Sequence, residues 1–351
     1  MPVATAGEPI VGLIAGDAEW SSATLADRLN QVLSRTGAKW LREGFFWNVI
    51  EPSPGTFDFG HYDQFMLLAA KRHVHVLALL YQAPRWAAAT PNTIPADPSA
   101  YAAYVAAVVA RYGPDGTFWD AYPDLRAYGI QTYDLWSEPY YDIGNNGDYD
   151  PGRYARLVKA AATAGRAADP AAKFLMGAEM QGEMVGRNWV WWVNAMYQAV
   201  PDLNNYFDGV SVHPYGHDIT GLAPAIPNRP YYGYLQMRRI ELIRKQFVQH
   251  GAADKPLWAT EVGWPTCTHG SNRCVTDAGQ VRSLKTLLRY SRTIWKSFIR
   301  AVFIYYYDDT KGSRADPDND YGLTYVNNAP KPALPVFRQF AMLAPVTSGW
   351  Q

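Results

Sequence analysis

Two glutamates stand at matching points of two separate apolar stretches. Glu138 follows the aromatic-rich run in IQTYDLWSEPYYD, residues 130–142, and Glu261 ends the apolar run of PLWATEVGWPT in the same way. Two carboxylates that face one cleft can break a glycosidic bond, because one protonates the leaving oxygen while the other attacks the sugar or activates water. Either glutamate alone could instead cap a helix or pair with a surface arginine. The two together favour the catalytic interpretation.

The elements that would position these glutamates alternate along the whole chain. Eight apolar runs lack strict alternation of apolar and polar residues, as expected for strands covered on both faces. They cover residues 9–16, 38–46, 74–81, 130–136, 172–179, 207–215, 256–263 and 301–308. Stretches between them show the apolar repeat and the end signals of helices. Four such stretches cover residues 99–113, 152–169, 236–251 and 279–296.

This alternation predicts an α/β fold, a (β/α)8 TIM barrel, with residues 1–351 as a single catalytic domain. Strand eight and the closing helix are expected within residues 301–345. An open doubly wound sheet should carry a glycine-rich turn after its first strand, and GLIAGDAEW does not form that fingerprint. Chemistry in barrels lies at the C-terminal ends of the strands. Glu138 and Glu261 end the candidate strands four and seven.

The composition narrows the class of ligand. The 351 residues carry 32 basic and 32 acidic side chains, so no basic surplus favours nucleic acid or an anionic membrane. No apolar run reaches the roughly 18 residues of a membrane span. The chain has 13 Trp and 24 Tyr, an excess that fits a cleft in which aromatic rings stack on sugars. We expect a carbohydrate substrate, no nucleic-acid partner, no membrane span and a monomer.

The two cysteines, Cys267 and Cys274, lie in PTCTHGSNRCVTD. They could form a small disulfide, remain free thiols or supply half of a metal site. His269 is the only near neighbour that could ligate, which disfavours a four-ligand zinc site. We favour the disulfide, which indicates a secreted or periplasmic protein. The start, MPVATAGEPIVGLIAGD, lacks a basic n-region, so we expect the signal peptide to be absent from this sequence.

Neither a cofactor nor a metal is expected. No cluster of His, Asp and Glu has the spacing of metal ligands, and no phosphate-binding loop is present in the sequence.

The motifs WSEP and WATEVGW resemble the signatures of clan A glycoside hydrolases, nearest to family 39 and its relatives, which include bacterial endoglycosidases of exopolysaccharide, with family 5 as second choice. The resemblance covers nearly the whole chain. It implies a retaining β-glycosidase with Glu138 as acid/base and Glu261 as nucleophile. In WLREGFFW, Arg42 matches the arginine that holds the nucleophile, and in VSVHPYG, Tyr215 matches a tyrosine that hydrogen-bonds it. Arg42 could instead be an ion pair in the barrel floor.

One residue departs from the family pattern. Ser137 stands where these enzymes usually have an asparagine that binds the 2-hydroxyl of the sugar. A serine offers one hydroxyl on a shorter arm in place of an amide fork. The resemblance therefore implies either an unusual sugar, a bridging water or a slower enzyme at this position.

Further side chains are candidates for substrate binding. Aromatic platforms for sugars could come from Trp47, Trp136 and Trp264, although most Trp in such a sequence is core. At strand eight, where the clan often has a Trp, alternation lets one or two of Tyr305, Tyr306 and Tyr307 face inward. The remaining candidates are Glu179, a third carboxylate at the barrel mouth, and His213, which could equally be a polar residue beside a turn.

The expected function is retaining hydrolysis of O-glycosidic bonds, β-type by the resemblance, in a polysaccharide or glycoconjugate. The alternative is a catalytically weak or inactive carbohydrate-binding barrel, which only Ser137 favours. A hydrolase with Ser137 as nucleophile would need a histidine partner and a G-x-S-x-G turn, and the chain has W-S-E-P there.

Overall fold

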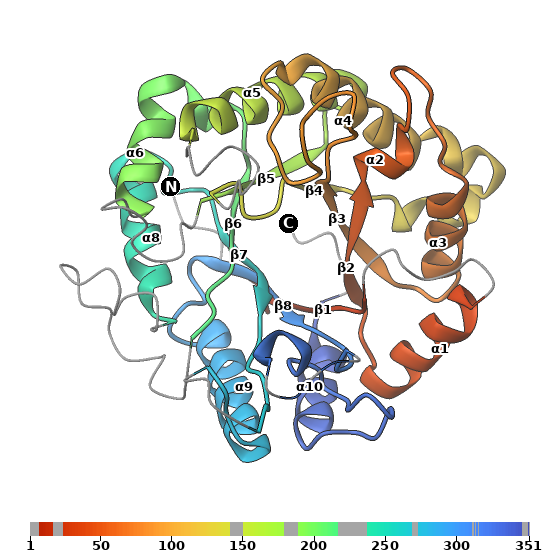
Figure 1. Cartoon of the computed structure of the whole chain (residues 1–351), viewed down its shortest axis with the longest axis vertical. Coiled ribbons are helices and arrows are strands. Elements are labelled where there is room, and N and C mark those ends of the chain that lie inside the picture. Colours follow the sequence, from red (N-terminus) through yellow and green to blue (C-terminus); the bar gives the residue numbers. More distant parts are fainter. Residues whose placement is uncertain are drawn as a thin grey trace.

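The computed structural model describes residues 7–16, 24–140, 150–178, 189–216, 237–268, 273–310, 312, 314, 316–345 and 350. Its strands form a closed barrel in which each strand pairs in parallel with its neighbours in sequence and β8 returns to β1. Helices surround the ring of strands (Figure 1). The predicted (β/α)8 barrel is therefore confirmed.

All eight strands lie where the apolar runs predicted them. Their bounds are β1 Ile10–Ile14, β2 Trp40–Phe46, β3 His75–Tyr81, β4 Thr132–Leu135, β5 Lys173–Gly177, β6 Gly209–Val212, β7 Leu257–Val262 and β8 Ile299–Tyr305. Only β8 begins outside its predicted range, two residues early. A register shift in the pairing of β7 with β8 lies between Ala259 and Val262, beside Glu261.

The helices also follow the predicted stretches. The long ones are α1 Leu25–Thr36, α3 Gly60–Lys71, α4 Pro98–Tyr112, α5 Pro151–Ala168, α6 Trp189–Ala199, α8 Arg239–Gln249, α9 Asp277–Arg292 and α10 Ala333–Leu343, and a short α2 covers Trp47–Ile50. Side chains of Asp97, Asp150 and Thr276 accept backbone N–H bonds at the starts of α4, α5 and α9, which explains where these helices begin. Among the described residues, no helix is long and apolar enough to cross a membrane.

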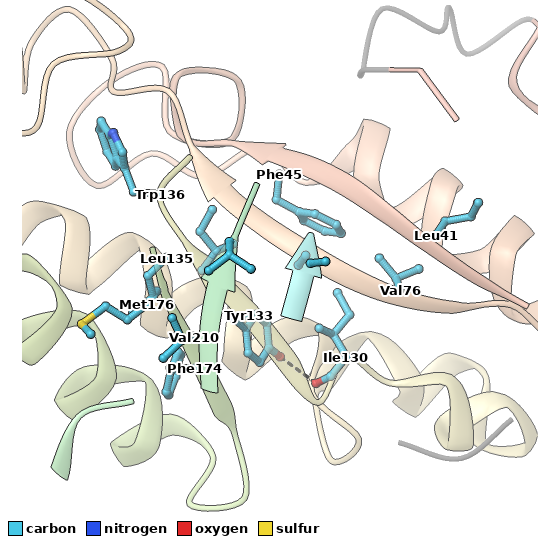
Figure 2. Close-up of a cluster of buried hydrophobic side chains, with 14 of the residues drawn as sticks. Leu41, Phe45, Val76, Ile130, Tyr133, Leu135, Trp136, Phe174, Met176 and Val210 are labelled. Carbon is cyan, nitrogen blue, oxygen red and sulfur yellow. Dashed lines mark hydrogen bonds between the residues drawn. The ribbon is translucent and has the colours of Figure 1, made fainter. Parts of the chain in front are cut away.

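Strand residues alternate between two cores. Side chains that point outward pack against the helices, and they include Leu41, Phe45, Val76, Tyr133 and Leu135 (Figure 2). Side chains that point inward form a separate cluster, here called the apolar floor, made of Ile10, Trp40, Leu77, Leu175, Trp258, Ala301 and Phe303. Near the far end of the sequence, Trp350 stacks on Trp258 at 5.6 Å between ring centroids and donates a hydrogen bond to Thr132.

Above the apolar floor, the barrel interior holds four polar side chains, here called the polar layer: Arg42, Asp134, Ser211 and Thr260. Arg42 bonds Asp134, which accepts from Ser211, and Ser211 bonds Thr260. These residues come from β2, β4, β6 and β7. Since β3 separates β2 from β4 and β5 separates β4 from β6, the bonds of Asp134 with Arg42 and Ser211 cross the inside of the barrel.

A disulfide joins Cys267 to Cys274, as predicted. It lies in the loop after β7, the strand that carries Glu261. The same loop is fastened to the loop after β8, because Thr266 donates its N–H to the carbonyl of Asp320 and Gln280 binds the carbonyls of Trp264 and Gly322.

Candidate active site

Glu138 leaves β4 on an unusual backbone. Trp136 has φ of 73° and Glu138 has φ of 45°, in the left-handed region that side chains other than glycine rarely adopt. Such conformations persist only where the surrounding structure holds them, and they cluster at functional sites. The turn carries Glu138 from the end of β4 toward the barrel mouth, where its side chain is 30% exposed.

Two donors hold the Glu138 carboxylate from opposite chain segments. The hydroxyl of Tyr140 donates to Oε1 at 3.1 Å, and Nδ1 of His213, which follows β6, lies 2.9 Å from the same oxygen. Tyr140 is buried, so its hydroxyl is a fixed donor rather than a solvent-exposed one. The orientation of Glu138 is therefore set by side chains from two different βα loops.

Glu261, at the end of β7, accepts a hydrogen bond on each of its two carboxylate oxygens. Arg42 donates from Nη1 to Oε1 at 2.8 Å, and the hydroxyl of Tyr215 donates to Oε2 at 3.1 Å. Burial raises the pKa of this carboxyl, but the positive charges of His213 and Arg42, with the bonds from Arg42 and Tyr215, outweigh burial and lower the pKa below its ordinary value. Glu261 is thus held in its ionised form.

The two carboxylates and His213 meet at one point. One oxygen of Glu138, one ring nitrogen of His213 and one oxygen of Glu261 all lie within 4.8 Å of one another. Carboxyl groups in retaining glycosidases lie about 5–5.5 Å apart, whereas inverting enzymes need about 6.5–9.5 Å to fit a water. An oxygen of Glu138 and an oxygen of Glu261 thus approach more closely than the separation that an inverting enzyme needs.

The same three groups could ligate a cation, although their spacing in the sequence did not indicate it. A histidine must be neutral to bind a metal. Burial lowers the pKa of His213, but the charges of Glu261 and Glu138 and the bond to Glu138 outweigh it and raise the pKa. The raised pKa favours the protonated imidazole, and a protonated imidazole does not bind a metal.

Three tyrosines form an aromatic wall beside Glu261. Tyr215, Tyr305 and Tyr321 pack edge to face, with ring centroids 5.5–6.1 Å apart. Tyr305 ends β8 and remains partly exposed, so its ring can contact a ligand. Of the aromatic candidates considered at strand eight, Tyr305 and Tyr306 both lie at this wall, with ring centroids 4.5 Å apart, but Tyr306 is buried and Tyr305 is the more exposed of the two.

Two of the predicted sugar platforms are core residues instead. Trp47 is fully buried, stacks on Tyr104 and donates its indole N–H to Glu51 at 2.7 Å. Trp264 is 2% exposed beneath the loop after β7, where its carbonyl accepts from Gln280. Neither ring offers a face to a ligand, so the prediction is wrong for both. The residues follow strand ends, as platforms do, but turn back into the helix layer.

Tyr307 is a further wrong prediction, whereas Trp136 borders the site. Trp136 is 2% exposed and packs edge-on against Tyr81 and Tyr101, but it also lines a small cavity together with Glu138 and His213, so its contact with a sugar stays a prediction. Tyr307 is fully buried, accepts a hydrogen bond from Arg35 and lies under the guanidinium of Arg28. Tyr307 therefore faces α1 rather than the barrel mouth.

The remaining predicted residues are placed as follows. Ser137 is half-buried beside Glu138, on the turn that leaves β4. Glu179 lies outside the described residues, as does the segment 217–236 after β6. Arg42, His213 and Tyr215 come together with Glu138 and Glu261.

Sequence reasoning missed Tyr140, Tyr321 and Asp134. Asp134 had a visible signal, because a charged residue in the apolar run TYDLW must find a partner once the strand is buried. Tyr140 follows Glu138 by two residues, yet the turn geometry that brings its hydroxyl to the carboxylate is not readable from spacing. Tyr321 joins the aromatic wall only through the long loop after β8.

No family model matches the chain, and no curated protein matches it by sequence. Solved structures match its fold. A family 39 glycoside hydrolase from Bacteroides cellulosilyticus WH2 aligns with a TM-score of 0.68 and 19% identity, over 96% of this chain and 64% of that one. A family 39 β-xylosidase from Caulobacter crescentus aligns with a TM-score of 0.64 and 17% identity, over 96% of this chain and 72% of that one.

An endo-β-1,4-glucanase from Xanthomonas axonopodis pv. citri also aligns, with a TM-score of 0.61 and 13% identity, over 96% of this chain and 99% of that one. The chain spans less than two thirds of the family 39 hydrolase from Bacteroides. At these identities the likeness defines the fold, and in fold the chain resembles the family 39 enzymes, as its motifs predicted.

Proposed function

We propose that the protein is a retaining glycosidase that cleaves β-type O-glycosidic bonds in a polysaccharide or glycoconjugate. The observation that carries this proposal is the placement of Glu138 and Glu261 at the ends of β4 and β7 with carboxylate oxygens within 4.8 Å. The likeness in fold to glycoside hydrolases supports it.

The reaction follows from the contacts of each carboxylate. Ionised Glu261 attacks the anomeric carbon while Glu138 gives its proton to the leaving oxygen, and a covalent glycosyl-enzyme forms as the glycosidic bond breaks. The ester removes the negative charge of Glu261. Glu138, now ionised, takes a proton from water, whose oxygen attacks the anomeric carbon. Glu261 leaves as a carboxylate, and Glu138 again carries a proton.

The neighbours of the carboxylates have supporting roles in this scheme. Arg42 and Tyr215 fix both oxygens of Glu261, which orients the nucleophile before attack. His213 contacts both glutamates and can stabilise whichever one is ionised. Tyr305 is the proposed platform for the sugar ring.

We also propose where the protein is located and in which oligomeric state it acts. A disulfide persists in oxidising compartments, which supports a secreted or periplasmic location. We propose that the chain acts as a monomer with one catalytic domain, on a carbohydrate.

Covalent labelling tests the proposal. A panel of aryl glycosides first identifies the accepted sugar, and its 2-fluoro glycosyl derivative should then label Glu261, located by peptide mass spectrometry. Glu261→Gln should lose turnover and labelling, while the matched control Glu8→Gln, in a half-exposed ion pair with Arg292, should keep both. A chain that binds oligosaccharides but never labels would instead be the non-catalytic barrel.

A further inference from the structure

A buried aspartate stands behind the nucleophile. Asp134 lies on β4, four residues before Glu138, and its side chain is fully buried. Its Oδ2 atom accepts from Nε and Nη2 of Arg42 at 3.3 and 3.1 Å, and from the hydroxyl of Ser211 at 3.2 Å. Arg42 uses its remaining terminal nitrogen, Nη1, to bind Glu261. One guanidinium thus joins two carboxylates, only one of which reaches the barrel mouth.

The charge balance of this arrangement determines how strongly Arg42 acts on Glu261. Arg42 is always positively charged, and its side chain is 4% exposed, so water screens it little. Asp134 offsets part of that charge. If Asp134 were neutral, its repulsion of Glu261 would vanish and the attraction from Arg42 would no longer be offset. Glu261 would then be a weaker base.

We propose that Asp134 is a positioning residue which, through Arg42, sets the basicity of Glu261 and hence its strength as the attacking carboxylate. The inference rests on the proposed function. A weaker base is a poorer nucleophile and a better leaving group. Loss of the Asp134 charge therefore slows formation of the glycosyl-enzyme and speeds its hydrolysis. A residue that only filled space in the barrel would not change the two steps in opposite directions.

Several other side chains surround the carboxylates of Glu261 and Asp134. Arg42, His213 and Tyr215 lower the pKa of Glu261. The charge of Glu138 and the phenols of Tyr305 and Tyr321 raise the pKa of Tyr215.

Arg42, His213 and Ser211 also act on Asp134, and the buried phenols of Tyr101 and Tyr154 lie close enough to sense its charge. Burial raises the pKa of Asp134, although Arg42, His213 and Ser211 oppose that shift. Within the part of the chain that the structure describes, Asp134 is a carboxylate that contacts Arg42 but does not reach the barrel mouth.

The decisive variant is Asp134→Asn. Among the described residues no hydrogen-bond donor reaches Oδ1 of Asp134, so an amide nitrogen can replace that atom while the amide oxygen keeps the bonds from Arg42 and Ser211. With an aryl glycoside, kcat/KM should fall roughly tenfold, as expected for a less basic nucleophile. The acid limb of kcat/KM against pH should move to lower pH. Single-turnover measurements should show faster hydrolysis of the trapped glycosyl-enzyme.

Matched variants separate charge from packing. Ser211→Ala removes a neutral bond to the same oxygen and should lower thermal stability while leaving the acid limb where it was. Restoring the charge by Ser211→Asp in the Asp134→Asn background should return the limb toward its wild-type position. If Asp134→Asn does not fold, a double variant exchanges the two residues, with Asp134→Ser and Ser211→Asp in one chain. The carboxylate then stands at position 211, next to its original place. An active enzyme with the wild-type limb then supports the proposal, and a displaced limb overturns it.

Two failures can be told apart. If wild-type enzyme labels at Glu261 but Asp134→Asn leaves the acid limb and both chemical steps unchanged, the role of Asp134 is wrong and the proposed function stands. If wild-type enzyme never labels at Glu261, the proposed function itself fails.

Discussion

Nδ1 of His213 lies 2.9 Å from Oε1 of Glu138. The same nitrogen lies 3.6 Å from Oε2 of Glu261, so one buried imidazole serves both carboxylates. The two carboxylates raise the pKa of His213, which favours its charged form. Through their charges, both Arg42 and His213 lower the pKa of Glu261.

Replacing His213 should move the acid limb of kcat/KM in the direction opposite to Asp134→Asn. The charge of His213 helps to lower the pKa of Glu261, so His213→Asn should raise that pKa and shift the limb to higher pH. A pH profile with an aryl glycoside measures the shift. A limb that stays in place would show that His213 carries no charge in the free enzyme.

Tyr140→Phe should lower kcat/KM by about 10-fold while leaving the fold intact. The variant removes the 3.1 Å bond to Glu138, and an intramolecular hydrogen bond contributes about 0.5–1.5 kcal/mol. Tyr206→Phe is the matched control, because its hydroxyl binds Asp202 on the exposed surface. Equal activity in the two variants would remove Tyr140 from the site.

Tyr305 and Trp47 should respond differently to substitution. Tyr305→Ala removes the partly exposed ring at the barrel mouth and should raise KM several-fold. Trp47→Phe should leave KM unchanged and lower the free energy of unfolding by about 1–3 kcal/mol, because it shrinks a buried ring that donates to Glu51. Kinetics and denaturant unfolding of both variants provide the measurement. A raised KM in Trp47→Phe would argue that the site extends beneath α2.

The disulfide should stabilise the fold by a modest amount. Cross-linking a loop this short is expected to contribute about 2–3 kcal/mol by restricting the unfolded chain. Replacing both Cys267 and Cys274 by serine should lower the free energy of unfolding by that amount, and thiol titration of oxidised wild-type protein should find no free cysteine. Identical denaturation curves with and without reductant would contradict this expectation.

Trp350→Ala should lower stability without affecting catalysis. Its ring packs on Trp258 in the apolar floor and its N–H binds Thr132 at 2.7 Å, at the opposite end of the barrel from Glu261. Since Trp350 is only partly buried, a loss of about 1–3 kcal/mol is expected. Thermal unfolding and kcat/KM, measured on the same preparation, test both halves of the prediction.

The barrel and its two glutamates were predictable because the order of residues along the chain is enough to recognise them. Eight apolar runs mark strands covered on both faces, and Glu138 and Glu261 each end one of them. The orientation of the other aromatic candidates was not predictable. A residue after a strand end faces the mouth or the helix layer according to local φ and ψ, and Trp136 has left-handed backbone that no residue type near it announces.

The polar layer shows a second limit. Arg42, Asp134 and Ser211 come from strands that are not neighbours, so their contacts depend on closure of the barrel and on its shear. A family resemblance in the sequence placed Arg42 near Glu261. Nothing in the spacing of β4 and β6 indicated that Asp134 would bind Arg42 or that Ser211 would bind Asp134.

The apolar floor, which Trp350 closes, affects how strongly the buried charges above it are screened. A region of tightly packed tryptophan, leucine and phenylalanine polarises weakly, so it screens little of the field from Arg42, Asp134 and Glu261 immediately above it. Water at the barrel mouth screens strongly. The field of these charges is therefore least attenuated on the side of the apolar floor. The lower half of the barrel is a medium of low polarity, in which Arg42, Asp134 and Glu261 act on one another with little screening from below.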